Sequence, residues 1–414
     1  MRSKHGRLGV KVGLVVALAG CARAPAPGTP AAVGLVRPGI EVLLTDSARV
    51  WQGRRLGLVT NQGGIDRAGV HAVDRLRAAG ARLVALFSPE HGFRGAAAPG
   101  EAVVSTTDSA TGLPIYSLYG RTRAPTDSML TGIDLLLVDL PDVGARYYTY
   151  LSTTIEVMRA AGRRKIPVAV LDRPNPIGGS VHGEVLDTAF RSFVGALAVP
   201  NRHGLTLGEQ ALLAREELGI DVTVTVIPAH GWRRSMLFGM TGLPFIPPSP
   251  NLKDVEALFH YPGTCLFEGT ALSVGRGSDA PYRQIGAPWL DAERVIAMVS
   301  GADRRGVLLK PVTFTPDHPA DGKHAGIEVR GIRLHLFDSD AYDPVRTAVA
   351  LLAAIQRVHP EQIGWNQRGF DRLAGGATLR EAILAGRSPE EVASGWRVAR
   401  DAFRDRARRI RIYR

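Results

Sequence analysis

The feature that most constrains the fold is a regular alternation of short apolar runs and amphipathic segments between residues 55 and 227. Runs typical of buried strands lie at 55–60, 83–87, 133–138, 168–171 and 222–227. Helical spacing of apolar residues predicts helices at 70–79, 149–161 and 205–218. Val70 is placed on the apolar face of the first, and Thr206 with Glu209 forms a capping box in the last. Strands that alternate with helices indicate a parallel sheet, and continuously apolar strands predict burial on both faces.

The pattern changes after the last of these strands. Residues 244–289 are rich in proline and glycine and are predicted to form long functional loops. A smaller α+β unit follows, with a helix at 293–298, a strand at 326–336, a helix at 345–358 and last helices starting near Thr378 and Pro389. For 414 residues this predicts two domains, an α/β domain at 39–288 and a C-terminal α+β auxiliary domain at 289–414.

The N-terminus has the pattern of a secretory leader. Basic residues precede an apolar stretch at 12–19, which is too short to span a bilayer as a helix. The segment ends Leu18-Ala19-Gly20-Cys21, which resembles the lipobox of bacterial lipoproteins. The resemblance implies cleavage after residue 20, so that 1–20 is a signal peptide, and acylation of Cys21, which would anchor the chain in a membrane. Residues 21–38, rich in proline and alanine, are predicted to form a tether.

Composition excludes several functions. The net charge is +12, but the basic residues are spread along the chain with no interleaved aromatic stripe, so no nucleic-acid partner is expected. With Cys21 lipidated, Cys265 is the other cysteine, which excludes an internal disulfide and predicts a small buried side chain. No zinc motif, P-loop, dinucleotide fingerprint or nucleophile elbow occurs, and we expect no metal and no cofactor.

Polar side chains follow four of the predicted strands. They are Asn61, Glu90 with His91, Asp139 with Asp142, and Asp172 with Asn175. Because parallel strands end at one edge of a sheet, where α/β proteins bind ligands, we expect these residues at a site. Each has a structural alternative. Asn61 could serve a turn, Asp142 and Asp172 could be helix caps or partners of Arg146 and Arg173, and His203 could be a loop histidine.

Acids gathered at one edge suit glycoside hydrolysis. That reaction uses two carboxyl groups, one that protonates the leaving oxygen and one that attacks or activates water. Glu90 lies between Phe87 and Phe93, where desolvation would favour the acid form. His91 and Arg94 are candidates to orient Glu90 or to bind a substrate carboxylate. The second acid has three candidates, Glu268, Asp142 and Glu184, and spacing does not choose among them.

Several longer motifs resemble the bacterial exo-β-N-acetylmuramidase family, peptidoglycan glycosidases formerly described as a domain of unknown function. They are VTNQ at 59–62, SPEHGFRG at 88–95, GLPIYSLYG at 112–120, DVGARYYTY at 142–150, DRPNP at 172–176, FEGT at 267–270 and SVGRG at 273–277. The resemblance runs from about residue 39 to the C-terminus. It implies a Rossmann-like domain, a smaller C-terminal domain, a site in the cleft between them, and release of N-acetylmuramic acid from the non-reducing end of peptidoglycan fragments.

Transferred to this sequence, the resemblance makes Glu90 the catalytic acid, with Glu268 as our choice for the second carboxylate. The implied substrate-binding residues are Asn61, His91, Arg94, Asp142, Arg146, Tyr147, Asn175, His203 and Arg276. The lactyl carboxylate of muramic acid gives an arginine a reason to be present. The chain departs from the family at residues 324–328, HAGIE, where a cysteine-containing turn is expected, and this difference could alter the rim of the cleft.

The expected protein is therefore a periplasmic, lipid-anchored enzyme of the outer membrane that acts on muramyl saccharides during cell-wall recycling. Ala22 after the cysteine favours the outer membrane over the inner one. The main alternative is a non-catalytic sugar- or muropeptide-binding lipoprotein. An esterase or amidase ranks below it because no nucleophile motif occurs. Oligomeric state and stereochemical outcome do not follow from the sequence.

Overall fold

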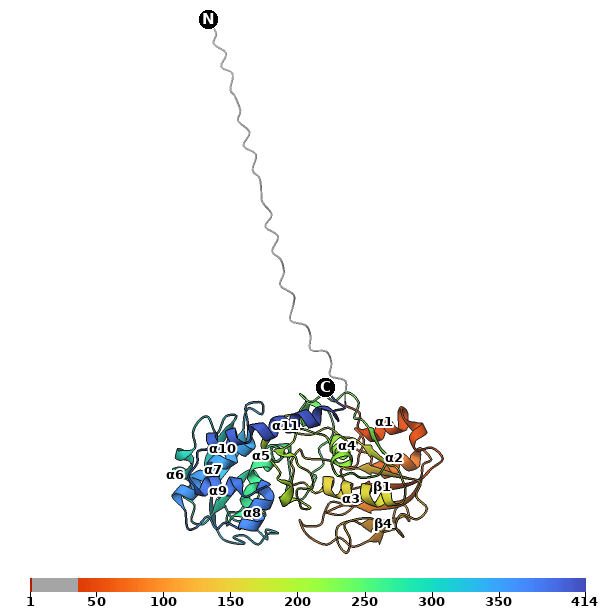
Figure 1. The fold of residues 1–414 in the computed structure, drawn as a ribbon, viewed down its shortest axis with the longest axis horizontal. Coiled ribbons are helices and arrows are strands. Elements are labelled where there is room, and N and C mark those ends of the chain that lie inside the picture. The colour runs from red at the N-terminus through yellow and green to blue at the C-terminus, as the bar shows by residue number, and fades with distance from the viewer. Residues whose placement is uncertain (2–35) are drawn as a thin grey trace. The chain divides into compact units, whose positions relative to one another are not determined.

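The computed structural model describes residue 1 and residues 36–414 (Figure 1). The predicted signal peptide beyond residue 1, the lipidation site Cys21 and most of the tether lie outside the described residues. Among the described helices, none combines the length and apolar character needed to cross a membrane.

A seven-stranded sheet forms the first part of the structure, in the order β3-β4-β2-β1-β5-β6-β9. Its strands are β1 (Arg55–Thr60), β2 (Arg82–Ser88), β3 (Thr106–Thr107), β4 (Pro114–Ser117), β5 (Leu135–Asp139), β6 (Val168–Leu171) and β9 (Val224–Ile227). All neighbouring pairs are parallel except β3 with β4. The predicted α/β class is confirmed, and β1 and β6 begin and end where the sequence pattern places them.

Helices cover both faces of this sheet, as the apolar strands predicted (Figure 1). Leu56 and Leu58 pack with α1 (Gly39–Thr45) and α2 (Ala72–Ala78) on one face. Val59 and Val138 pack with α3 (Tyr150–Arg163) and α4 (Leu207–Glu217) on the other. The capping box of α4 is present as predicted, because Thr206 and Glu209 exchange side-chain and backbone hydrogen bonds.

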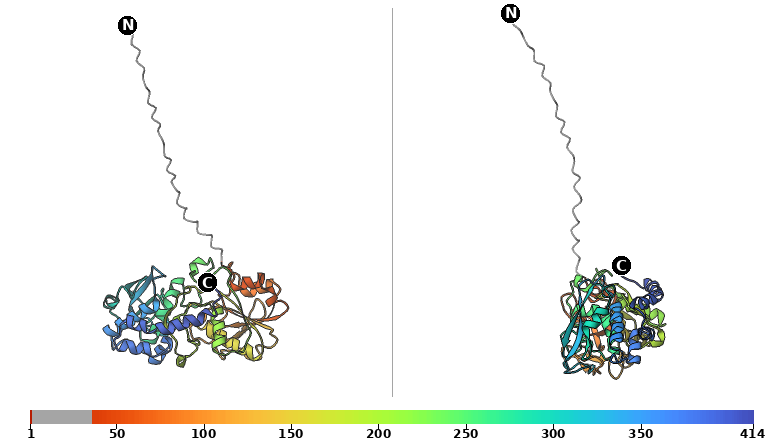
Figure 2. Two further views of the ribbon diagram at one scale, coloured as in Figure 1. Left: turned by 45° about the horizontal axis from the view of Figure 1, so that its top comes forward. Right: turned by 90° about the vertical axis from the view of Figure 1, so that its left-hand side faces the viewer.

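The second part contains a three-stranded antiparallel sheet surrounded by helices. The sheet has the order β10-β12-β11 and is formed by β10 (Gln284–Ala287), β11 (Val307–Phe314) and β12 (Val329–Leu336). The helices are α5 (Val255–Thr264), α6 (Ala292–Met298), α7 (Pro344–Val358), α8 (Gln367–Ala374), α9 (Thr378–Leu384), α10 (Pro389–Gly395) and α11 (Arg397–Arg408). Figure 2 shows these blue and green elements beside the sheet of the first part. The predicted α+β character is confirmed.

Several short elements complete the described structure. They are the hairpin β7 (His182–Val185) with β8 (Pro200–Arg202) and the 3₁₀ turns η1 (Ala48–Val50), η2 (Thr188–Phe190), η3 (Phe238–Met240) and η4 (Cys265–Gly269). The C-terminus returns to the first sheet, where the Tyr413 hydroxyl donates to Asp172 (2.7 Å) and accepts from the backbone N–H of Ala229 (2.8 Å). The last residues of the chain are therefore part of the packing around the parallel sheet.

The prediction of long loops over 244–289 was wrong in part. The region contains α5, η4 and β10. Pro262 and Gly263 belong to this region rich in proline and glycine, but they lie in the last turn of α5. Gly263 permits close packing, because a Cβ there would lie 2.1 Å from the carbonyl oxygen of Pro344 at the start of α7. A helix breaker at a helix end costs little, and here glycine is required by tertiary contact.

The helix predicted at 70–79 is shorter than expected. It begins at Ala72, and the His71 side chain caps it by accepting from the Val73 N–H. Val70 precedes the helix and is 40% exposed, so its placement on the apolar face was wrong. The pattern also gave no indication of β11 and α8.

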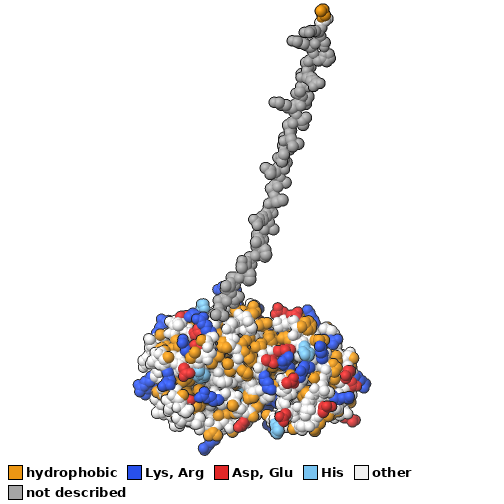
Figure 3. Space-filling model, turned by 180° about the vertical axis from the view of Figure 1, so that it is seen from behind, with side chains coloured by type: hydrophobic (Ala, Val, Ile, Leu, Met, Phe, Trp, Pro, Cys, Tyr) orange, Lys and Arg blue, Asp and Glu red, His pale blue; other side chains and the backbone are white. Residues whose placement is uncertain are grey.

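The surface carries charges of both signs. Acidic and basic side chains lie next to one another on the face shown in Figure 3. This face shows no broad basic area of the kind that a nucleic-acid-binding protein presents.

Candidate active site

Glu90 and Glu268 line one cavity of about 170 Å³. Glu90 follows β2 of the parallel sheet, and Glu268 belongs to η4 of the second part. The other polar and aromatic side chains around the cavity are His91, Tyr147, Tyr148, Thr149, Ser249, Tyr261, Arg276 and Tyr282. The structure therefore places two acids from distant parts of the sequence around one space at the carboxyl edge of the sheet.

The carboxyl group of Glu90 is held by neutral donors. One oxygen accepts from the Thr149 hydroxyl at 2.7 Å, and the other accepts from the Gly100 N–H at 2.9 Å. Glu90 is 8% exposed, and no cation within the described residues forms an ion pair with it. A carboxyl group bound only to neutral donors can exchange a proton without first breaking an ion pair.

The loop after Glu90 is fixed by His91. This residue has φ +70°, a conformation uncommon for residues other than glycine. Its Nδ1–H donates to the Ala97 carbonyl at 2.8 Å, since that oxygen can only accept. The loop thereby turns back and brings the Gly100 N–H to Glu90.

Glu268, Arg276 and Tyr282 form a connected cluster in the lining of the same cavity. One oxygen of Glu268 accepts from Arg276 Nε (3.2 Å), Arg276 Nη2 (2.7 Å) and the Tyr282 hydroxyl (2.7 Å). Burial raises the pKa of Tyr282, so its hydroxyl stays protonated as a donor. Arg276 Nη1 is buried and has no partner among the described residues. A buried donor without an acceptor is costly, and a ligand in the cavity could supply the missing acceptor.

The segment that carries Glu268 is supported from behind. Lys323 Nζ donates to the carbonyls of Glu268 (3.0 Å), Thr270 (2.7 Å) and Leu272 (3.0 Å). His324, the first residue of the stretch that departs from the family pattern, contacts the Ala271 carbonyl through Nε2 at 2.9 Å. The divergent turn therefore begins in contact with the segment that carries the second acid.

Of the predicted site residues, Glu90, His91, Tyr147, Glu268 and Arg276 come together at the cavity. The six others, Asn61, Arg94, Asp142, Arg146, Asn175 and His203, lie outside its lining. Arg94 has an exposed side chain 3.5 Å from Asp108. Asn175 is used in a turn, accepting from the Ile177 N–H and donating to the Leu205 carbonyl.

Asn61 supports the site indirectly. Its side chain accepts from the Gly63 N–H, as expected for a turn, and donates to the Tyr150 hydroxyl at 2.7 Å. That hydroxyl lies 3.3 Å from the carbonyl oxygen of Glu90. The end of β1 is thus linked to the end of β2 beneath the cavity.

Arg146 is a structural residue in this fold. Its guanidinium donates to four main-chain carbonyls, those of Glu184, Val199, Leu373 and Ala374, at 2.7–2.9 Å. No hydrogen-bonding capacity of its two terminal nitrogens is directed into the cavity. Tyr147 does line the cavity, and its hydroxyl is engaged with Pro262 and Asn201.

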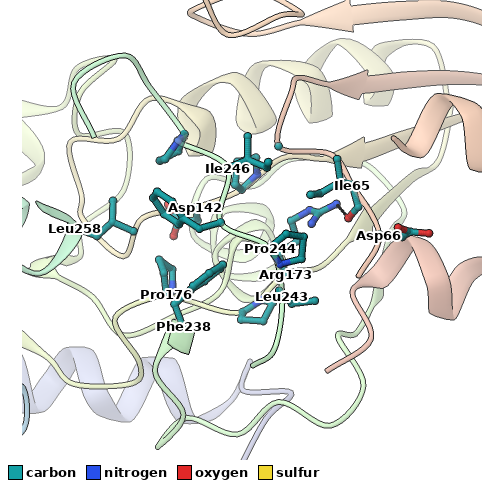
Figure 4. Close-up of a pocket in the computed structure, with 15 residues that line it drawn as sticks. Ile65, Asp66, Asp142, Arg173, Pro176, Phe238, Leu243, Pro244, Ile246 and Leu258 are labelled. Atoms are coloured by element: carbon teal, nitrogen blue, oxygen red, sulfur yellow. Dashed lines mark hydrogen bonds between the residues drawn. The ribbon is translucent and has the colours of Figure 1, made fainter. Parts of the chain in front are cut away.

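Asp142 lies at a second, smaller cavity of about 60 Å³ (Figure 4). Its wall is mainly proline, leucine, isoleucine and phenylalanine side chains. Arg173 also lines it but is bound to Asp139 and to the Ile65 carbonyl. Asp142 accepts from Gln210 and lies 3.5 Å from His203 Nε2. The two acids that line this cavity, Asp66 and Asp142, do not point toward one another (Figure 4). This cavity is therefore less suited to glycoside hydrolysis, which needs two acids around one bond.

Besides the turn role of Asn61, two structural alternatives raised by the sequence hold. Asp172 caps the region before α4, accepting from Thr206 (2.6 Å) and the Gly208 N–H (2.9 Å). Of the two alternatives for Asp172, a helix cap or a partner of Arg173, the structure shows the cap, because Arg173 is bound to Asp139. His203 is a buried loop histidine, with Nδ1 accepting from Leu205 and a pKa lowered to about 3 by burial and by Arg146 and Arg202.

Sequence reasoning missed Thr149, Tyr282 and Lys323 as parts of the site. Thr149 and Tyr282 lie in or near the quoted motifs, but neither has a charge that would single it out. Lys323 acts through main-chain carbonyls, which leave no trace in the sequence. The predicted character of Cys265 is confirmed, because its side chain is buried, next to Glu268.

Comparison with known proteins identifies the family of this chain. The family model described as exo-β-N-acetylmuramidase NamZ, N-terminal, matches residues 56–256, and the corresponding C-terminal model matches residues 259–413. The chain belongs to the NamZ family. This confirms the resemblance seen in the sequence motifs. The predicted domain boundary at residue 288 stays a prediction.

NamZ relatives match almost the whole chain. The peptidoglycan β-N-acetylmuramidase NamZ of Bacillus subtilis is 39% identical over 381 residues, 91% of each chain. Two crystal structures of DUF1343 family proteins from Bacteroides fragilis share 32% and 31% identity, with TM-scores of 0.84 and 0.76. Each comparison covers 92% of this chain and 99% of the other. The NamZ fold therefore extends over both parts described above.

Replacing Asp142 by asparagine is expected to change the pH dependence of stability. Burial raises the pKa of Asp142 from 3.8 to about 7 in the folded protein. The folded state then binds a proton that the unfolded state releases between about pH 4 and 7, so stability falls as pH rises through this window. The free energy of unfolding of the Asp142→Asn variant, measured with urea at several pH values, should decline less over this range, by up to about 1.4 kcal/mol per pH unit.

The exposed Asp74 provides a matched control. The Asp74→Asn variant should follow the wild-type pH profile. Parallel profiles for wild type and Asp142→Asn would contradict the assignment of a raised pKa to Asp142.

Proposed function

We propose that this protein is an exo-acting glycosidase that hydrolyses β-1,4-linked N-acetylmuramic acid from the non-reducing end of peptidoglycan fragments. The observation that carries the proposal is the pair Glu90 and Glu268 around one cavity. Hydrolysis of a glycosidic bond needs two carboxyl groups on opposite sides of the sugar. The name and family of the Bacillus subtilis relative support the same reaction and substrate. The acid pair favours hydrolysis over the binding-only alternative.

Glu90 takes the role of general acid in this proposal. Its carboxyl group is free of cations, so protonation does not cost an ion pair. A proton donated from this position would neutralise the oxygen of the departing sugar as the glycosidic bond breaks.

Glu268 takes the role of base or nucleophile. Either role requires an ionised carboxylate. The guanidinium of Arg276, 2.7 Å from Glu268, is a positive charge that can pair with one. All three hydrogen bonds from Arg276 and Tyr282 reach the same oxygen of Glu268. The second oxygen is thus left for water or the anomeric carbon.

Arg276 accounts for the choice of sugar. N-acetylmuramic acid differs from N-acetylglucosamine by a lactyl ether that carries a carboxylate. The unpartnered Nη1 of Arg276 is a buried cationic donor on the cavity wall. An arginine–carboxylate contact would bind that group and fix the sugar between the two acids.

We also propose that the chain is lipidated at Cys21 and acts in the periplasm, attached to the outer membrane. The basic leader, the short apolar stretch and the Leu18-Ala19-Gly20-Cys21 sequence support this.

Mass spectrometry of the protein expressed in a Gram-negative host tests the proposal. A diacylglyceryl group on residue 21 is expected, and a Cys21→Ser variant should be recovered without lipid; an unmodified Cys21 in the mature protein would contradict it.

Replacing Glu90 by glutamine should lower kcat by about 10²–10⁴-fold, the usual contribution of a general acid. The loss is expected to be larger for the disaccharide MurNAc-GlcNAc than for a nitrophenyl β-N-acetylmuramide. A sugar needs a proton to leave, whereas nitrophenolate departs as an anion. Steady-state kinetics on both substrates measure the difference.

Glu101→Gln is the matched control, because Glu101 lies in the same loop, is exposed and does not line the cavity. This variant should keep wild-type rates. Unchanged turnover by Glu90→Gln, or an equal loss on both substrates, would remove Glu90 from the role of acid.

Replacing Arg276 by glutamine should abolish the preference for a charged lactyl group. The substrates are two nitrophenyl muramides, one with the natural carboxylate and one with a neutral carboxamide. The wild type should prefer the carboxylate, and the variant should lose about 10- to 100-fold of that selectivity in kcat/KM, as for a charged hydrogen bond. The substitution also removes the partner of Glu268, but any loss of activity from this cause lowers kcat/KM equally for the two substrates. It therefore cancels in the ratio of the two kcat/KM values.

Arg283→Gln serves as the control, because Arg283 pairs with Asp254 and Glu256 and does not line the cavity. It should retain the selectivity. A ratio for Arg276→Gln equal to that of the wild type would show that the lactyl carboxylate is bound elsewhere.

A further inference from the structure

We propose that an arginine-lined groove next to the active-site cavity binds carboxylates of the glycan chain beyond the bond that is cut. This inference rests on the proposed function and extends it to the leaving part of the substrate. The groove has a volume of about 440 Å³ and contains Arg191, Arg368 and Arg372. We call it the arginine groove.

Two segments form the walls of the arginine groove. One is the end of η2 with Arg191, and the other is α8, which carries Arg368 and Arg372. A backbone hydrogen bond from the Asp187 N–H to the Gly375 carbonyl (2.8 Å) joins the two walls. Their relative position is therefore fixed by the main chain.

Both walls continue into the active-site cavity. Leu373, the residue after Arg372, lines the cavity, and so does Val194, three residues after Arg191. The Leu373 carbonyl is held by Arg146, and the Phe193 carbonyl accepts from Ser152 in α3 at 2.6 Å. A chain that leaves the cavity between Val194 and Leu373 would enter the arginine groove.

The groove carries uncompensated positive charge. Within the described residues, none of the three arginine side chains forms an ion pair or a side-chain hydrogen bond. The one acid in the groove, Asp371, is bound through both oxygens to Arg380 at 2.8 Å. Unpaired guanidinium groups in a concave surface attract carboxylates, which they can bind through two parallel hydrogen bonds.

The chemistry of the substrate supplies such carboxylates at regular intervals. Peptidoglycan alternates N-acetylglucosamine with N-acetylmuramic acid, so every second sugar carries a lactyl carboxylate or a peptide that ends in one. An exo-acting enzyme takes the terminal muramic acid into its cavity and leaves the rest of the chain outside. The first outer carboxylate then lies on the second sugar beyond the cleaved bond, where the arginine groove can bind it.

The test compares a tetrasaccharide, MurNAc-GlcNAc-MurNAc-GlcNAc, with nitrophenyl β-N-acetylmuramide. The full-length triple variant Arg191→Gln, Arg368→Gln, Arg372→Gln should show a KM for the tetrasaccharide raised at least about fivefold at low salt. Its kcat/KM for the nitrophenyl substrate should match the wild type. The wild-type KM for the tetrasaccharide should rise with salt, since exposed charge pairs are screened.

The matched control replaces three exposed arginines that line no described pocket, Arg49, Arg305 and Arg397, with glutamine. It has the same net charge as the test variant and should keep the wild-type KM. An unchanged tetrasaccharide KM in the test variant, or the same increase in the control, would overturn the proposal that the arginine groove binds substrate carboxylates.

Calorimetric binding separates this inference from the proposed function. If the wild type hydrolyses neither substrate, the proposed function fails. The role of the arginine groove is then tested by comparing the tetrasaccharide affinities of the test and control variants. Weaker binding by the test variant than by the control supports the arginine groove, and equal binding overturns it.

Discussion

The guanidinium of Arg146 holds the two sides of the active-site cavity together. Its four hydrogen bonds reach carbonyls before and after the η2 loop and at the end of α8. Burial lowers the pKa of Arg146, and an uncompensated charge in the interior would be costly, so these carbonyls are an essential counterpart. The next residues along the chain, Tyr147 to Thr149, line the cavity from one side, and Leu373 lines it from the other. The cavity between two distant parts of the sequence depends on this interaction.

The two acids of the cavity, Glu90 and Glu268, have different surroundings, and this difference suggests different roles. Glu90 follows a strand of the parallel sheet, and its carboxyl group accepts only from neutral donors. Glu268 is fixed on a short 3₁₀ turn by Arg276 and Tyr282 in front and by Lys323 behind. The neutral surroundings of Glu90 suit a proton donor, and the guanidinium beside Glu268 suits a base or nucleophile. The same guanidinium retains a free donor for the substrate.

The sequence predicted the parallel sheet well because its strands are continuously apolar and its helices amphipathic, so local pattern and tertiary burial agree. Where tertiary contact decides, prediction was wrong. The proline and glycine content of residues 244–289 suggested loops, but Pro262 and Gly263 end a helix that packs closely on Pro344. The site followed the same rule. Strand ends located Glu90, but spacing could not tell which polar side chains face the cavity. Asn61, Asn175 and His203 turn inward to satisfy backbone groups. Glu268 was a candidate for the second acid, but spacing could not choose it over Asp142 and Glu184.

The most direct test of the central claim, that a muramyl sugar is cut between Glu90 and Glu268, is a crystal structure of the Glu90→Gln variant with MurNAc-GlcNAc bound. In that structure we expect the glycosidic oxygen within hydrogen-bond distance of the amide at residue 90, about 3 Å, with the sugar ring facing Glu268 and the lactyl carboxylate bound to Arg276. A disaccharide bound instead at the cavity with Asp142 and Arg173, or with its glycosidic oxygen turned away from residue 90, would contradict it.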